Sequence, residues 1–314
     1  MKIWTDIKQE FRVGNNLTRI MYINVGVFVA LFLIRLLSWL FTASDQSGLY
    51  GFVIKNIQTY LNPDFLILKP WTLFTYMFTH ESFFHILFNM LWLYWMGRIF
   101  IDLLNGKRLV AIYLLGGIAG ALLSLAAFQL LPALKPAIES GNPAPMLGAS
   151  AAVMAITAAI ATYVPNYEIR LLFFGNVAIK YIALVAVGLD ILFLPDGNAG
   201  GRFAHIGGAL FGFVWAYKLK QGTDISKWFM TVLDSVAVWF RPKPKSHMHV
   251  SYKNKKQKKG TYVHYEETNT SSSQTEYSQA EIDTILEKVA RSGYESLTAK
   301  EKKILFSSSN RNRK

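Results

Sequence analysis

The chain has 314 residues, of which 52% are hydrophobic, and its mean hydropathy of +0.25 is high for a soluble protein. It contains no cysteine, which excludes a thiol nucleophile, a disulfide framework and a cysteine-based metal site. The formal net charge of +13 comes from basic residues that mostly flank apolar runs or lie in the C-terminal third, so we expect basic surfaces facing a membrane and no nucleic-acid partner.

Six apolar runs are each long enough to cross a bilayer as a helix, which takes roughly 20 residues. Charged side chains interrupt two of them, at Arg35 in the first run and at Lys180 and Asp190 in the fifth. Each costs roughly a few kcal/mol in a membrane unless it pairs or reaches the interface. The pattern predicts an all-α, polytopic membrane protein. The runs lie at 20–41, 83–101, 109–131, 147–164, 171–194 and 203–219.

Basic residues set the expected orientation of these helices. They gather in the polar segment 1–19, in the links before the third and fifth runs, and after the sixth, whereas the opposite loops carry fewer. By the positive-inside rule, both termini are expected to be cytoplasmic. No cleavable signal peptide or targeting segment is apparent at the start, which favours a bacterial inner membrane.

The chain changes character after the sixth run. Apolar residues recur at helical spacing in 220–240, which predicts an amphipathic helix lying on the inner membrane surface. A basic and serine-rich linker follows at 241–279, and its lysines are expected to lie near anionic lipid of the inner leaflet. We expect a small two-helix cytoplasmic module at 280–306, suited to docking a partner, and a disordered basic end at 307–314.

The two helices of this module have their own sequence signals. The Ser292-Gly293 pair is expected to end the first helix, and Thr298 with Glu301 forms a capping box that starts the second. The first helix carries one apolar stripe, which consists of Ile282, Ile285, Leu286 and Val289.

The predicted orientation brings the starts of the second, fourth and sixth runs to the outer half of the membrane. Ser150 begins the fourth run and His205 the sixth, and His85 and Asn89 lie at the start of the second. Because polar and ionisable side chains are costly in hydrocarbon, their gathering at one depth predicts a functional site.

Ser150 has an ordinary explanation as a packing or N-cap residue and a chemical one as a nucleophile. The chemical one needs a base about 3 Å from the hydroxyl. His205 is the candidate, since Gly208 and Gly212 lie one turn apart on its helix face. Glycines at that spacing typically mark close helix packing, which would let the sixth run bring His205 to Ser150.

His85 and Asn89 are four residues apart, and therefore about 40° apart around a helix. The amide of Asn89 and the ring N–H of a neutral His85 can both donate to an oxyanion, a contribution of about 3 kcal/mol per donor. His80 lies about 140° from His85 around a helix and is expected to make a supporting hydrogen bond instead.

Zinc chemistry is the alternative that the stretch HESFFH raises. A zinc metalloprotease motif needs two histidines four residues apart on one helix face, whereas His80 and His85 are five apart and diverge. We therefore expect no metal and no other cofactor.

Taken in order, the motifs resemble those of the rhomboid family of intramembrane serine proteases. They are HESFFHILFNM at 80–90, GAS at 148–150 and AHIGGALFG at 204–212. The resemblance covers the six runs, roughly residues 20–219, and leaves the tail outside. It implies a bundle of six transmembrane helices in which the fourth is short and recessed.

The resemblance also implies roles for individual residues. Ser150 would be the nucleophile and His205 the base, in a dyad without an acidic third member, with His85 and Asn89 as oxyanion-hole donors. Met154 stands where the family commonly has an aromatic residue packed on the catalytic imidazole, and the loop 196–201 corresponds to a mobile cap. His80, Gly148, Met154, Gly208 and Gly212 are expected to support the site.

The expected activity is that of a serine endopeptidase that cleaves single-pass transmembrane proteins near the outer face of the membrane. The alternative from another class is a non-catalytic, rhomboid-like chaperone or adaptor that binds membrane helices. Relatives of that kind usually lack the serine or the histidine, and this chain keeps both.

Overall fold

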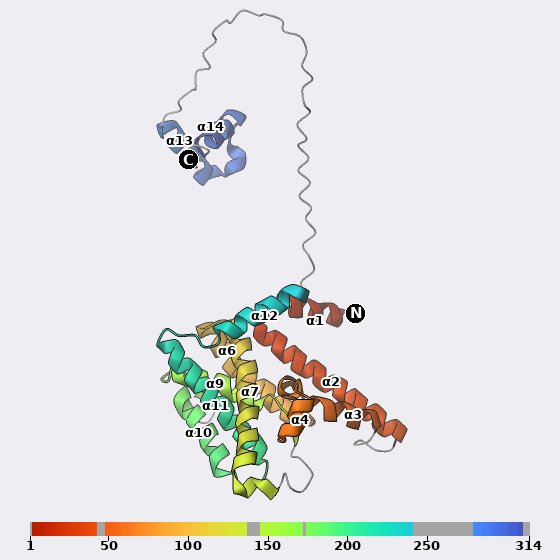
Figure 1. Cartoon of the computed structure of the whole chain (residues 1–314). Helices are drawn as coiled ribbons and strands as arrows, with labels where there is room; N and C mark the ends of the chain where they lie inside the picture. Colours follow the sequence, from red (N-terminus) through yellow and green to blue (C-terminus); the bar gives the residue numbers. More distant parts are fainter. Residues whose placement is uncertain (1, 43–47, 137–144, 172–173, 241–278, 310–314) are drawn as a thin grey trace, which may run out of the picture. The chain divides into compact units, whose positions relative to one another are not determined.

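The computed structural model describes residues 2–42, 48–136, 145–171, 174–240 and 279–309 (Figure 1). The chain divides into two compact units, Met1–Pro244 and Lys245–Lys314. The predicted linker lies outside the described residues at 241–278, and so does 310–314 of the predicted disordered end.

The first unit is mostly helical, with two short antiparallel strand pairs. Its long helices are α2 (Asn16–Thr42), α6 (Phe83–Leu103), α7 (Gly106–Leu130), α9 (Ser150–Tyr163), α10 (Ile179–Leu192) and α11 (Ala199–Lys220). The other helical elements of this unit are α1 (Lys2–Val13), α3 (Gly48–Ile57), α4 (Pro63–Leu68), α5 (Thr72–Thr75), α12 (Lys227–Phe240) and the 3-10 turns Tyr76–Phe78 and Pro132–Leu134. β1 (Thr59–Tyr60) pairs with β2 (Pro145–Met146), and β3 (Glu168–Leu171) with β4 (Gly175–Ala178).

The fifth apolar run begins as a hairpin and not as a helix. β3 and β4 pair in a register that sets Leu171 opposite Gly175, and α10 starts only at Ile179. Gly175 turns the chain with a φ of +69°, a left-handed conformation that costs a glycine little. The prediction of one continuous helix over 171–194 is therefore wrong for its first part, because the hydropathy of a short apolar stretch does not distinguish a strand from a helix.

Three helices in the described part of the chain are long and apolar enough to cross a membrane, namely α2, α6 and α7. α9 is apolar but has only 14 residues. That length is about 21 Å, short of the roughly 30 Å of a hydrocarbon core. α10 also has 14 residues, and α11 has 22 with two lysines in its last turn. Length and composition thus identify candidates for three of the six expected spans.

α9 is the buried centre of the bundle. Every residue from Ala151 to Ile160 is buried. α11 approaches α9 so closely that a Cβ at Gly208 or Gly212 would collide with the carbonyl oxygen of Ala151 or Ala155, respectively. α7 packs against the same two alanines from another side through two glycines of its own. The small residues therefore let three helix backbones meet at contact distance.

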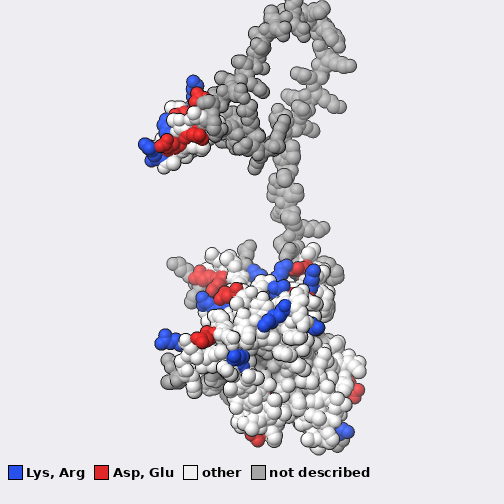
Figure 2. All heavy atoms as spheres, turned by 90° about the vertical axis from the view of Figure 1, so that its left-hand side faces the viewer, with Lys and Arg blue, Asp and Glu red and all other residues white. Residues whose placement is uncertain are grey.

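Charge is distributed unevenly over the first unit. Figure 2 shows Lys and Arg gathered toward one end of a face that is otherwise largely uncharged. The first turn of α7 makes two ion pairs, which join Arg108 Nε to Asp224 Oδ2 at 2.8 Å and Lys107 Nζ to Asp234 Oδ2 at 2.9 Å. An apolar belt with a basic end is the charge pattern typical of helical membrane proteins.

α12 forms only part of the amphipathic helix predicted over 220–240. It begins at Lys227, and Phe229 is its buried contact with the bundle. Trp228, Val232 and Val236 recur every four residues and are all exposed. An exposed apolar stripe of this kind is what a helix lying on a membrane presents to lipid, so the predicted interfacial role stays a prediction.

The second unit contains α13 (Gln279–Ser292), a 3-10 turn (Tyr294–Ser296) and α14 (Ala299–Ser309). Its core is formed by Ile285, Leu297 and Ile304. Gly293 ends α13 with a φ of +78°, as the Ser-Gly signal predicts. Leu286, a member of the predicted apolar stripe, is 49% exposed, because α14 covers a narrower face of α13 than the stripe spans.

The carboxylate of Glu301 joins the two helices of this unit. It accepts hydrogen bonds from Lys288 Nζ at 2.8 Å and from the backbone N–H and the hydroxyl of Thr298 at 2.7 and 2.8 Å. The Lys288 bond first, and then the Thr298 bonds, lower the pKa of Glu301 to about 2. This side chain therefore stabilises the unit above its ordinary pKa of 4.5, and that stabilisation is lost as the pH falls from there towards about 2.

We expect the methyl NMR signals of Ile285 and Ile304 in the full-length protein to lose their dispersion over this pH window. Glu301→Gln should remove the pH dependence, whereas Glu287→Gln should keep it, because Glu287 lies in an exposed pair with Arg291. An unchanged pH profile in Glu301→Gln would contradict the assignment.

Candidate active site

Ser150 is the first residue of α9 and is held by the segment that precedes it. The N–H of Gly148 donates to the carbonyl oxygen of Tyr76 at 2.9 Å, and the N–H of Ala149 donates to His80 Nε2 at 3.3 Å. Gly148 has a φ of +114°, and a Cβ there would lie 2.7 Å from the His85 ring. A side chain at Gly148 is thus disfavoured both by its backbone conformation and by the imidazole beside it.

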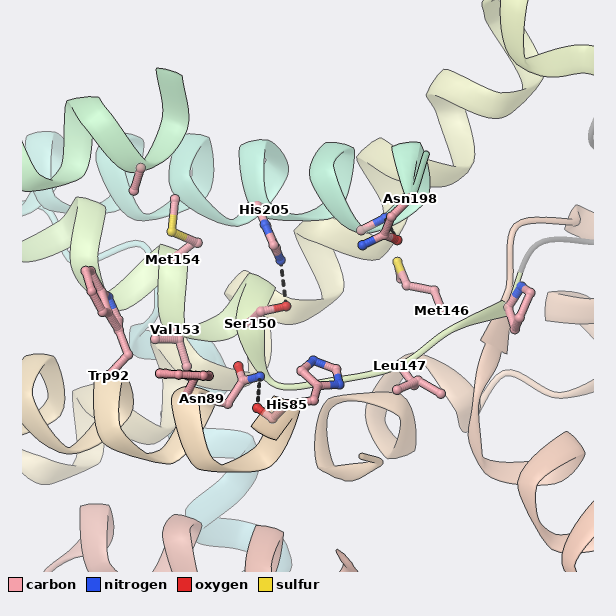
Figure 3. Close-up of a pocket in the computed structure, with 14 residues that line it drawn as sticks. His85, Asn89, Trp92, Met146, Leu147, Ser150, Val153, Met154, Asn198 and His205 are labelled. Carbon is pink, nitrogen blue, oxygen red and sulfur yellow. Dashed lines mark hydrogen bonds between the residues drawn. The ribbon is translucent and has the colours of Figure 1, made fainter. Parts of the chain in front are cut away.

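His205 lies in the second turn of α11 and faces Ser150. Its Nε2 is 2.7 Å from Ser150 Oγ (Figure 3). The close approach of α11 to α9 at Gly208 and Gly212 makes this contact possible, since both glycines lie on the helix face of His205. The structure therefore brings together the two residues predicted to react, which are 55 positions apart in the sequence.

Asp190 lies against the other ring nitrogen of His205, a contact that no sequence pattern predicted. Its two carboxylate oxygens lie 3.0 and 3.1 Å from His205 Nδ1. The expected dyad without an acidic third member is thus incorrect as a description of the geometry. The available signal was the presence of a lone carboxylate in an apolar helix, which favours a functional role but does not identify its partner.

His85 and Asn89 lie one turn apart on α6, beside Ser150 (Figure 3). Asn89 is buried, and its Nδ2 donates to the His85 carbonyl oxygen at 2.9 Å. The ring of His80 lies 5.0 Å from that of His85, between centroids, and is buried. His80 makes the kind of supporting hydrogen bond expected of it, since it accepts from the segment before Ser150.

A cavity of about 590 Å³ opens beside the serine. The polar side chains of His85, Asn89, Ser150 and His205 share it with Asn198. Its apolar lining includes Phe88, Trp92, Leu147, Val153, Met154 and Ala186. Such a cavity, mostly apolar with a few converging polar groups, is typical of a site that binds an apolar segment.

Met154 and the segment 196–201 both contribute side chains or backbone to the lining of this cavity. Met154 lines it and packs with Ala209, Ala186 and Val187, while the expected contact with the imidazole stays a prediction. The expected cap over 196–201 is shorter than predicted, because 199–201 form the first turn of α11. Asn198 caps that helix by accepting a hydrogen bond from the N–H of Gly201 at 3.3 Å, and this side-chain cap fixes where α11 starts.

In the described part of the chain, no group of three or more His, Asp or Glu side chains is arranged to hold a metal ion. The groups that the site presents are a hydroxyl, an imidazole and a carboxylate.

A serine hydroxyl, an imidazole and a carboxylate lie in hydrogen-bonded series, the arrangement of groups that a Ser-His-Asp site has, here within a helical bundle of membrane character. A Rhomboid domain model matches residues 68–222, which include all of these side chains. The chain belongs to the rhomboid family. Residues 271–311 match a second model, DUF6576, a family of unknown function.

Three relatives illustrate the extent of the similarity. RHOMBOID-like protein 12, mitochondrial, of Arabidopsis thaliana is 28% identical over 207 residues, which cover 59% of this chain and 62% of the relative. Presenilin-associated rhomboid-like protein, mitochondrial, of Homo sapiens is 30% identical over 157 residues, 48% of this chain and 37% of the relative. Rhomboid protein 1, mitochondrial, of Saccharomyces cerevisiae is 27% identical over 166 residues, 52% of this chain and 45% of the relative.

The chain thus spans less than two thirds of the length of each of these relatives. Their names also correct the expected location. All three are named as mitochondrial proteins, and this contradicts the expectation of a bacterial inner membrane.

Proposed function

We propose that the protein is an intramembrane serine endopeptidase that cleaves single-pass transmembrane proteins through Ser150 and His205. The observation that carries this proposal is the 2.7 Å separation of Ser150 Oγ and His205 Nε2. A neutral imidazole at that distance takes the hydroxyl proton while the oxygen attacks a peptide carbonyl, and later gives the proton to the leaving amine. Water then releases the acyl group by the same exchange of protons.

The developing oxyanion is assigned to His85, Asn89 and the backbone N–H of Ser150. An asparagine amide has two N–H groups, and one of those on Asn89 is used by the His85 carbonyl, which leaves the other for the oxyanion. The N–H of Ser150 belongs to the first turn of α9, where helix N–H groups have no partner within the helix. Each such donor contributes about 3 kcal/mol in the transition state.

In the proposed arrangement, α9, α10 and α11 cross the membrane together with α2, α6 and α7, which makes six spans. The short, buried α9 supports a serine that lies below the membrane surface, close to one face. A substrate helix must then unwind at the cut, because its own hydrogen bonds shield the peptide carbonyl. Glycine or another small residue near the cut would ease that unwinding.

A non-catalytic protein that binds membrane helices is the rival function. It would have use for the apolar cavity but none for a serine hydroxyl held against an imidazole, so the Ser150–His205 contact favours the enzyme. Lipid binding by the basic stretch after α12 and a docking partner for the second unit remain predictions.

The proposal is tested by labelling the full-length protein in liposomes with a fluorophosphonate probe and, in parallel, offering it a single-pass transmembrane substrate. We expect mass spectrometry to place the label on Ser150 and the substrate to be cut. Ser150→Ala should abolish both, whereas Ser235→Ala should change neither, because Ser235 is an exposed residue of α12. Substrate binding without label or cleavage would overturn the enzyme and favour the binder.

A further inference from the structure

We propose that Asp190 is a positioning residue that orients His205 for proton transfer from Ser150. This inference rests on the proposed function and goes beyond it, since the family resemblance implies a dyad in which no carboxylate takes part. The juxtaposition that carries it joins three helices: Ser150 from α9, His205 from α11 and Asp190 from α10.

The geometry selects one tautomer of the imidazole. Both carboxylate oxygens lie within 3.1 Å of Nδ1, and Ser150 Oγ lies 2.7 Å from Nε2. An ionised carboxylate can only accept hydrogen bonds, so the ring proton of a neutral His205 belongs on Nδ1. Nε2 is then left with its lone pair directed at the serine hydroxyl, which is the form that a base requires.

Burial makes this contact more than a surface pairing. The side chains of His205 and Asp190 are only 23% and 13% exposed. Within the described residues, both hydrogen bonds of the Asp190 carboxylate go to this one imidazole. Keeping a carboxylate in an apolar helix costs free energy. Asp190 lies on the opposite side of the His205 ring from Ser150, which is the position from which a carboxylate can assist the base.

The carboxylate would act chiefly in the transition state. When His205 takes the proton from Ser150, the imidazole becomes positively charged, and the negative charge of Asp190 stabilises it. The substrate does not contact Asp190, because this carboxylate lies behind His205 relative to Ser150 and is not among the residues that line the cavity. Loss of the carboxylate is therefore expected to lower kcat and to leave KM nearly unchanged.

The test compares Asp190→Asn, Asp190→Glu and the control Asp102→Asn in the full-length protein in liposomes. We expect Asp190→Asn to lower kcat by about 100-fold or more, because its amide can donate to Nδ1 and hold the wrong tautomer. KM should stay within about 3-fold and the thermal unfolding temperature should not fall. Asp190→Glu keeps the carboxylate and should recover part of kcat. Asp102 is an exposed carboxylate near the C-terminal end of α6, so Asp102→Asn should behave as wild type.

A merely structural role predicts a different set of results. Asparagine has nearly the same shape as aspartate and keeps a hydrogen-bonding oxygen, so it would then preserve kcat. The inference is overturned if Asp190→Asn cleaves like wild type while Ser150→Ala is inactive, and the proposed protease function survives that outcome. It is also overturned if kcat falls only together with the unfolding temperature. If wild type neither binds the probe nor cleaves, the protease function itself fails.

Discussion

Ser150→Ala and His205→Ala are each expected to lower kcat by about 10⁵-fold or more, and the double variant is expected to lower it no further. The reason is that the two side chains act as one unit across a 2.7 Å contact. A hydroxyl without a base is a poor nucleophile, and a base without the hydroxyl has nothing to activate. The measurement is single-turnover cleavage of a fluorescent transmembrane substrate in liposomes, with all three variants at equal protein content.

The double variant makes this prediction specific. If Ser150 and His205 contributed independently, their effects would multiply, and the double variant would be far slower than either single one. Multiplying effects would contradict the proposed shared mechanism. Full activity in either single variant would remove the mechanism altogether.

The second large effect is expected from Gly212→Ala. A Cβ at this position would collide with the carbonyl oxygen of Ala155, and backbone cannot move aside as a flexible side chain can. Overpacking of this kind costs about 1–3 kcal/mol, occasionally more. We expect a lower thermal unfolding temperature in detergent and a loss of cleavage, because α11 must move away from α9 and take His205 with it.

Gly26→Ala is the matched control for this substitution. Gly26 also lies within a long helix, α2, but a Cβ there would have nothing within 4 Å. Alanine favours a helix over glycine by up to about 1 kcal/mol, so this variant should unfold at the same temperature or a higher one. Equal unfolding temperatures for the two variants would show that α9 and α11 do not pack at the contact distance described.

Much of the site was predictable because its signals are local. A serine two residues after a glycine, a histidine on a glycine-bearing helix face and a His–Asn pair one turn apart can all be found by reading short stretches. The glycines were informative for a physical reason, since they permit a backbone approach that no larger residue allows. The prediction that Gly208 and Gly212 bring His205 to Ser150 matches the observed contact.

Other features were not predictable because local patterns are ambiguous. The run 171–194 is apolar throughout most of its length, yet it divides into a hairpin and a 14-residue helix. Hydropathy reports the preference of a segment for an apolar environment and not its secondary structure. The same limit applies to Leu286, whose place in an amphipathic stripe did not determine whether α14 covers it.

The sequence by itself determined most of the helical segments and which reactive residue types stand at their ends, because periodicity and composition act over a few neighbouring residues. Only the tertiary structure decided that Asp190 faces His205. That contact depends on the depth and rotation of α10 relative to α11, and these are set by packing among helices distant in sequence. A lone carboxylate in an apolar helix indicates that a partner is needed, and the folded bundle determines which residue it is.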